Sequence, residues 1–135
     1  MKDLLIIGAG GCGREVMQWV KDINKITPSW LIKGYLDDNL NALDGINSEF
    51  QIIDTIKHYT PKSDDVFVCS IGNSDTRKNI VERMKARGGT FVSVVHPTAI
   101  VADTAVLGEG VIIYPYALIS DNAVIGNQCI VNMYS

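Results

Sequence analysis

The sequence predicts an α/β domain with a parallel sheet, followed by the first coils of a parallel β-solenoid. Two observations predict the domain: a glycine-rich segment separates an apolar strand from a helical pattern, and strand and helix patterns then alternate. A third predicts the solenoid, because large aliphatic residues recur at every sixth position from Val95 onward. A chain of 135 residues has room for this combination but not for two large domains.

The first strand and helix have distinct hydrophobic periods. Leu4 to Ile7 is a continuous apolar run, typical of a parallel strand that is covered on both faces. An apolar stripe at helical spacing follows, made by Val16, Trp19, Val20 and Ile23. Thr27 to Ser29 contains a proline and ends that helix, and Trp30 to Leu36 predicts a second strand.

The middle of the chain predicts two further strands and a helix. Between residues 41 and 61 the pattern is ambiguous, with a short strand near Ile52 and a helical turn over Thr55 to Tyr59. Asp65 to Ile71 predicts a strand, and a helix follows whose apolar face includes Ile80, Val81 and Met84. Two glycines, 88 and 89, end it, and Thr90 to Val95 predicts another strand. Strand and helix alternation of this kind indicates a mostly parallel sheet.

The period of six runs through the rest of the chain. Its large members are Val95, Val101, Leu107, Ile113, Ile119, Ile125 and Val131. Four places after each comes a smaller residue: Ala99, Ala105, Val111, Ala117, Ala123, Cys129 and Ser135. Ordinary amphipathic strands alternate with a period of two and irregular turns, so seven consecutive matches favour a solenoid whose aliphatic residues fill its interior.

The glycine-rich segment is a candidate phosphate site. Gly8, Gly10 and Gly13 fit G-x-G-x-x-G directly after a strand and directly before a helix. Such a loop lets the backbone approach a phosphate, whose charge the helix N-terminus favours. The alternative is a tight turn that only lets strand and helix pack. Gly11 and Cys12 lie in the same loop, and we expect Cys12 to fill space beside a ligand rather than act as a nucleophile.

Further candidates follow the second and third predicted strands. Asp37 and Asp38 stand about where a dinucleotide-binding fold places an acid on a ribose hydroxyl, although Asp-Asp-Asn is also common turn chemistry. Gly72 and Asn73 end a strand at the same carboxyl edge, where Asn73 could bind a ligand but is better explained as a helix cap. Arg77 could reach a phosphate, but one turn into the helix we expect it to pair with a surface acid instead.

Composition excludes several classes of function. A net charge of −3 and a pI near 5.2 argue against a nucleic-acid partner. Three cysteines without framework spacing, no signal-peptide pattern and no membrane-length apolar run predict a cytoplasmic protein. His58 and His96 lack triad partners in the sequence, and we expect His96 to anchor the junction with the solenoid. No residues have metal-ligand spacing.

Four motifs in this order, GAGGCGREV, YLDD, SIGNSDTR and VVHPTAIV, lead into the hexapeptide repeats. Together they resemble the NeuD/PglD group of sialic-acid and nucleotide-sugar acetyltransferases. The resemblance implies a Rossmann-like domain, residues 1–94, that binds a UDP-sugar. It also implies a left-handed parallel β-helix, beginning with residues 95–135, that trimerises and holds acetyl-CoA between subunits.

The resemblance also implies roles for single residues. Gly10, Gly11, Cys12 and Gly13 would line the diphosphate, and Asp37 and Asp38 would contact the nucleoside. The family usually has a histidine where this chain has Cys12. Its general base, another histidine, follows the segment that corresponds to Val131 to Ser135, so no catalytic residue is assigned here and the acetyl-CoA site is expected to be incomplete.

Three functions remain to be compared. The first is transfer of an acetyl group from acetyl-CoA to an amine or hydroxyl of a sugar, with this chain expected to bind substrate without turnover. The second is a nucleotide-sugar-binding and oligomerisation module without catalysis. The third is an NAD-linked oxidoreductase, which the solenoid disfavours because dehydrogenases follow this loop with more sheet and a substrate domain.

Overall fold

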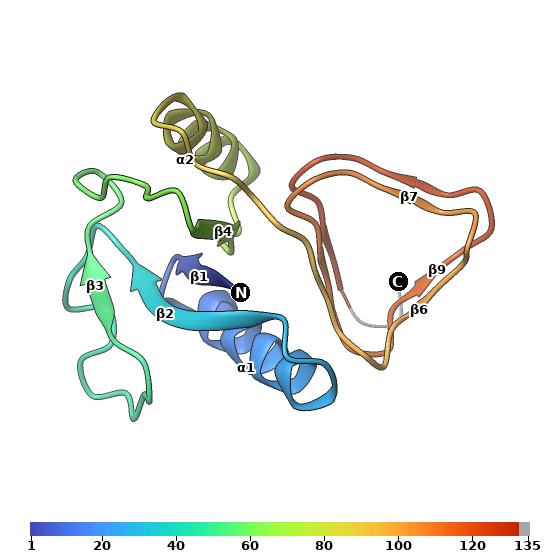
Figure 1. The fold of residues 1–135 in the computed structure, drawn as a ribbon, viewed down its shortest axis with the longest axis horizontal. Coiled ribbons are helices and arrows are strands. Elements are labelled where there is room, and N and C mark those ends of the chain that lie inside the picture. The colour runs from blue at the N-terminus through green and yellow to red at the C-terminus, as the bar shows by residue number, and fades with distance from the viewer. Residues whose placement is uncertain (133–135) are drawn as a thin grey trace.

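The computed structural model describes residues 1–132 and shows a small sheet domain beside a three-sided coil (Figure 1). Four parallel strands form the sheet in the order β3-β2-β1-β4. Their bounds are β1 Lys2–Ile7, β2 Trp30–Leu36, β3 Ile52–Asp54 and β4 Asp65–Cys69. The parallel α/β sheet is therefore confirmed.

The central strand β1 is buried on both faces. Leu4 to Ile7 have no exposed surface, and their side chains alternate between two cores. Leu4 and Ile6 pack with helix α1, Gly11–Ile26, while Leu5 and Ile7 pack with helix α2, Ser74–Ala86. The two helices thus cover opposite faces of the sheet. Within residues 1–132, neither helix has the length and apolar character needed to cross a membrane.

The connection from α2 to the coil differs from the prediction. Phe91 forms a single parallel bridge with Phe67 of β4, and strand β5, Val94–Val95, pairs with the coil instead of the sheet. The expectation of one strand over Thr90 to Val95 was therefore wrong. The reason is that the Val94 N–H donates to the Val111 carbonyl oxygen, so the coil takes these hydrogen bonds.

The coil repeats every 18 residues. Its strands are β5, β6 Ile100–Val101, β7 Val106–Leu107, β8 Ile112–Ile113, β9 Leu118–Ile119, β10 Val124–Ile125 and β11 Ile130–Val131. All pair in parallel at a separation of 18, as in Ile100 with Leu118 and Val106 with Val124. The aliphatic residues predicted at every sixth position line its interior, which confirms the solenoid. Ser135, the last small residue of the predicted pattern, lies outside the described residues.

Hydroxyl groups join one turn of the coil to the next. The hydroxyl oxygens of Ser93, Thr98 and Thr104 accept from the backbone N–H groups of Val111, Tyr116 and Asn122, each 18 residues later. The corner residues themselves recur every six positions in the left-handed region, at Gly110, Tyr116, Asn122 and Gln128. The corners therefore have their own repeating hydrogen bonds beside those of the strands.

One face of the coil packs against α1. Val94 and Ile112 are fully buried in the same core as Leu4 and Val16. At the edge of this interface, His96 Nε2 lies 2.8 Å from Asp22 Oδ2 of α1, and its Nδ1 accepts the Thr98 N–H. The hydrogen bond from His96 lowers the pKa of Asp22. The prediction that His96 anchors the junction is confirmed.

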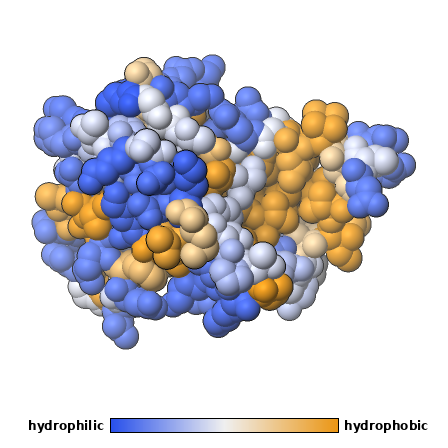
Figure 2. Space-filling view, in the orientation of Figure 1, coloured by the Kyte–Doolittle hydropathy of each residue, from blue (hydrophilic) through white to orange (hydrophobic). Residues whose placement is uncertain are grey.

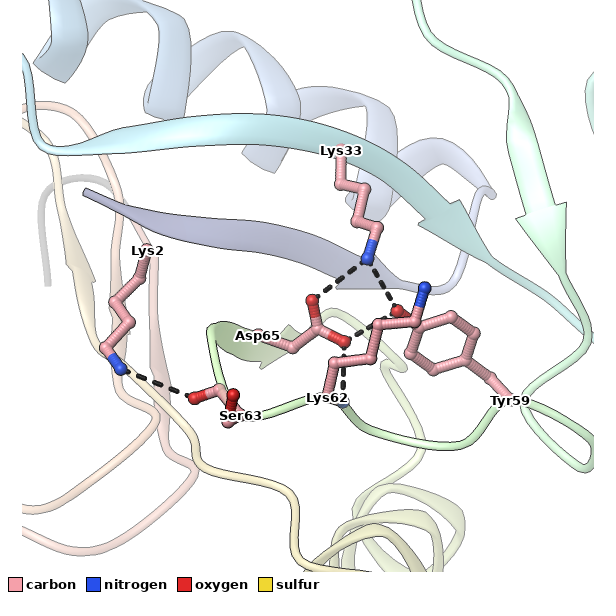
Figure 3. A network of polar contacts seen from close by, with 6 residues as sticks. All are labelled: Lys2, Lys33, Tyr59, Lys62, Ser63 and Asp65. Atoms are coloured by element: carbon pink, nitrogen blue, oxygen red, sulfur yellow. Dashed lines mark hydrogen bonds and ion pairs between the residues drawn. The ribbon is translucent and has the colours of Figure 1, made fainter.

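A second polar network holds the other end of the sheet (Figure 3). Asp65, at the start of β4, accepts hydrogen bonds from the Tyr59 hydroxyl at 2.6 Å and from Lys33 Nζ at 3.1 Å. The backbone N–H of Lys62 completes the set at 2.9 Å. The Asp65 side chain is fully buried, and Lys33 is the cation that pairs with it. The network ties β2 and β4 to the loop that joins β3 to β4.

Candidate functional site

Three loops meet at the carboxyl edge of the sheet, where β1, β2 and β4 end. The Gly8 N–H donates to the Leu36 carbonyl oxygen at 2.8 Å, which ties the loop after β1 to the end of β2. The Ser70 hydroxyl donates to the carbonyl oxygens of Ile7 and Gly8, which ties the loop after β4 to the same place. Ligands of α/β folds bind at this edge, so the loops form the candidate site.

The loop before α1 needs glycine at two positions. Gly8 has a φ of +98°, a conformation that other residues rarely adopt. A Cβ atom on Gly13 would overlap the Gly8 carbonyl oxygen, so only glycine lets the helix approach the strand this closely. The packing interpretation of the motif is therefore correct for these two residues.

The outer part of the same loop is open. No atom lies within 4 Å of the Cβ position on Gly10, and the N-cap residue Gly10 offers no side chain to the first helical turn. At Gly11 the nearest atom is a guanidinium nitrogen of Arg14, at 4.0 Å. The first N–H groups of a helix have no intrahelical acceptor, and α1 carries no acid in its first turn. This end of α1 can therefore accept an anion.

The two acids after β2 are engaged differently. Asp37 accepts the Ala9 N–H on Oδ2 at 2.9 Å and the Asn39 N–H on Oδ1 at 2.8 Å. With one oxygen Asp37 holds the glycine loop, and with the other it holds the turn that follows β2. Asp38 accepts the Lys57 N–H on Oδ1 at 3.0 Å, and within residues 1–132 no hydrogen bond reaches its Oδ2. The geometry leaves Asp38 with an oxygen for a ligand.

The loop after β4 contains Gly72 and Asn73. Asn73 Oδ1 accepts the Thr76 N–H at 2.9 Å, so its interpretation as the cap of α2 is confirmed. The expectation that Arg77 pairs with a surface acid was wrong. Its guanidinium donates to the carbonyl oxygens of Ile71, Gly72 and Gln128, because the loop and the coil corner present these acceptors directly in front of it.

A coil residue that the sequence did not single out also reaches the site. The Tyr114 hydroxyl lies 3.3 Å from Cys12 Sγ, and its ring meets Trp19 edge-on. Burial, together with the hydrogen bond to Cys12, raises the pKa of Tyr114, which keeps the hydroxyl protonated. Cys12 therefore joins the glycine loop to the coil. The two residues are 102 positions apart, and no local pattern marks such a pair.

The coil and the sheet domain also enclose a groove of about 410 Å³ between α2 and a coil corner. Neither histidine lies in its lining, and His96 is only 9% exposed with both ring nitrogens engaged. Across residues 1–132, no group of three or more His, Cys, Asp or Glu residues is placed to hold a metal ion.

Comparison with models of known protein families shows which family this chain belongs to. The profile of the PglD N-terminal domain matches residues 3–84, more than half of the chain. The chain belongs to the PglD N-terminal domain family. This agrees with the resemblance that the four motifs carry.

Relatives of this PglD-family chain are longer than it is. A UDP-N-acetylbacillosamine N-acetyltransferase from Bacillus subtilis is 29% identical over 117 residues, which are 84% of this chain and 51% of the relative. The chain therefore spans about half the length of the curated relative it matches.

Two solved structures share its fold. Perosamine N-acetyltransferase from Caulobacter crescentus, in complex with CoA and GDP-perosamine, has a TM-score of 0.82 at 19% identity, covering 98% of this chain and 60% of that one. WeeI from Acinetobacter baumannii has a TM-score of 0.80 at 22% identity, covering 99% and 62%.

Proposed function

We propose that this chain is the nucleotide-sugar-binding part of an acetyl-CoA-dependent sugar acetyltransferase. The observation that carries the proposal is the open N-terminus of α1 beside Asp38, at the edge where three loops meet. The N-acetyltransferase relatives support it, since the perosamine enzyme was solved with CoA and a nucleotide sugar.

The proposed roles follow from which groups are free. The N–H groups of Gly11, Cys12 and Gly13 would bind the diphosphate, with Gly10 leaving room for it and Gly8 shaping the turn. Asp38 would accept from the nucleoside through Oδ2, while Asp37 holds the loop. Gly72 and Asn73 would form the opposite wall of the site.

The proposed reaction transfers an acetyl group between two substrates. The acceptor nitrogen or oxygen attacks the thioester carbonyl carbon, the carbon–sulfur bond breaks, and CoA leaves as its thiol. A base removes the acceptor proton, and nothing in residues 1–132 is assigned to that step. The named relatives transfer to nitrogen, which favours an amine over a hydroxyl and over a sialic-acid acceptor.

We also propose that the coil is left-handed and that its free faces form a trimer. On the outside of the coil, Ile100 pairs with Leu118 on one face and Val106 with Val124 on the next, and these four side chains are 55–76% exposed. Figure 2 shows the apolar surface that gathers over the coil. The third face is already covered by α1, so two faces remain for neighbouring copies.

A module that binds and oligomerises without catalysis is the second candidate. Both ring nitrogens of His96 are hydrogen-bonded at the junction, so His96 has no free ring nitrogen to act as a base. This observation favours a module without catalysis. The division at residues 94 and 95 and the cytoplasmic location stay predictions in either case.

Calorimetry with UDP, GDP and NAD tests the proposed nucleotide-sugar site against the dinucleotide site of an oxidoreductase. We expect UDP or GDP to bind with a Kd between about 1 μM and 1 mM, the range of ordinary substrate sites. Binding of NAD in preference to both nucleotides would instead support an oxidoreductase. If neither nucleotide binds, the proposed nucleotide-sugar site is wrong.

A further inference from the structure

Arg77 donates hydrogen bonds to three of the four carbonyl groups in the loop between β4 and α2. Its side-chain Nη1 donates to the Ile71 oxygen at 2.8 Å and to the Gly72 oxygen at 3.1 Å. Its backbone N–H donates to the Asn73 oxygen at 2.9 Å. One residue thus fixes three successive peptide groups, and because a guanidinium is a planar fork, it fixes their directions as well.

The direction of these carbonyls determines where the neighbouring N–H groups point. In a trans peptide, the C=O and N–H bonds of one unit point to opposite sides. With the three oxygens turned toward Arg77, the N–H groups of Gly72, Asn73 and Ser74 are turned away from it. Within residues 1–132, these three N–H groups have no hydrogen-bond acceptor, and all three residues are exposed.

Arg77 holds the coil with the same side chain. Its Nε donates to the Gln128 carbonyl oxygen at 2.9 Å, at a corner of the coil whose φ is +60°. Lys85, further along α2, forms a separate ion pair with Glu109 of the coil. Of the two α2 residues, Arg77 contacts the loop and Lys85 does not. The two contacts between α2 and the coil can therefore be separated by mutation.

We propose that Arg77 is a positioning residue that turns the N–H groups of Gly72, Asn73 and Ser74 toward the bound nucleotide sugar and fixes this loop to the coil. The inference rests on the proposed function, because it assigns these donors to the same ligand. Arg77 itself touches no ligand in this arrangement. A lysine in its place keeps the charge but presents one ammonium group, which does not span two loop carbonyls and a coil carbonyl.

The test compares Arg77→Lys with Lys85→Ala and Arg83→Met. UDP affinity is measured by calorimetry, and amide exchange of residues 70–76 by mass spectrometry, where the hydrogen-bonded N–H groups of Ser70 and Thr76 report on the order of the loop. We expect Arg77→Lys to raise the Kd for UDP about tenfold, a loss of the order of one strong hydrogen bond, and to speed exchange in that peptide. Lys85→Ala removes a contact between α2 and the coil without touching the loop, and Arg83→Met removes a helix charge, so both are expected to leave the Kd unchanged.

Two outcomes overturn the inference. Unchanged exchange of residues 70–76 in Arg77→Lys would show that Arg77 does not hold the loop. An equal loss of UDP affinity in Arg77→Lys and Lys85→Ala would show that docking of the coil, rather than the loop, controls binding. Failure of the unaltered chain to bind UDP and GDP is a different result, which counts against the proposed function, and the exchange measurement still decides whether Arg77 orders the loop.

Discussion

Asp37 and Asp38 are neighbours in the sequence, but their carboxylates have different surroundings. Asp37 uses both oxygens to hold backbone N–H groups of Ala9 and Asn39, so it acts within the fold. Asp38 uses one oxygen for the Lys57 N–H and has the other available. Substituting an amide for each carboxylate therefore separates a structural role from a binding role.

Asp37→Asn is expected to lower stability, because an amide nitrogen replaces one of two oxygens that accept N–H groups. The expected loss is about 1–2 kcal/mol, measured by urea unfolding. Asp38→Asn keeps the oxygen that accepts from Lys57, so its stability should stay within about 0.5 kcal/mol of the original. Its Kd for UDP or GDP should rise several-fold. Equal nucleotide affinity of Asp38→Asn and the unaltered chain would remove Asp38 from the site.

Residues of the site could be predicted where their role depends on local geometry. Gly8 and Gly13 follow from the turn between strand and helix, and the cap at Asn73 follows from its place before a helix. The contacts of Cys12 with Tyr114 and of Arg77 with Gln128 could not be predicted in this way. Each joins the sheet domain to the coil, and their partners are fixed only when the two parts pack.

At the scale of elements, the network around Asp65 joins strands β2 and β4 to the loop between β3 and β4. Burial acts to raise the pKa of Asp65, but hydrogen bonds from Tyr59, the Lys62 N–H and Lys33 lower it by more, so the net direction is down. The hydrogen bond with Tyr59 raises the pKa of Lys33. Both groups are therefore held in their charged forms.

Asp65→Asn is expected to reduce the free energy of unfolding by about 2 kcal/mol at pH 7, the cost of a lost charged hydrogen-bond partner. A lowered pKa in the folded state stabilises fully above the unfolded value of about 3.9 and is lost as pH falls through the folded value. The difference between Asp65→Asn and the original chain should therefore shrink below about pH 4, measured by urea unfolding across pH.

Lys2→Ala is the matched control for this network. The Lys2–Asp64 pair lies on the surface at 3.8 Å, with side chains more than half exposed, and its removal should change stability by less than about 1 kcal/mol. A deficit of Asp65→Asn that stays constant down to pH 2 would show that the carboxylate charge is not its source.

Elements with a strong hydrophobic period could be predicted from the sequence, and the weakly marked ones could not. The apolar run in β1, the apolar stripe of α1 and the six-residue period of the coil each match the residues that are buried in that element. Such a pattern depends only on the geometry of the element itself. Residues 90–95 carry an apolar pattern that suits either the sheet or the coil. In the structure the Val94 N–H donates to the Val111 carbonyl oxygen, so this end of the segment belongs to the coil.

At the scale of the whole molecule, the exposed aliphatic pairs of the coil predict self-association. Leu118→Lys or Val124→Lys should shift the chain from a trimer toward a monomer in sedimentation velocity, because burying a lysine between copies is unfavourable. Leu40→Lys serves as the control, because Leu40 is 59% exposed and lies between β2 and β3 of the sheet domain. A monomer in the unaltered chain at high concentration would contradict the proposed trimer.

The hydroxyl contacts at a spacing of 18 residues limit how the coil can change in length. Adding or deleting 18 residues moves later segments by one full revolution, so Ser93, Thr98 and Thr104 would meet equivalent partners and each face would keep its orientation. Adding six would rotate all later residues by one side of the triangle. An outward-facing residue would then lie on a different face of the coil and would lose the contacts that it makes on its original face. Insertions of a whole revolution are therefore the natural step by which such a coil lengthens without changing what its faces present.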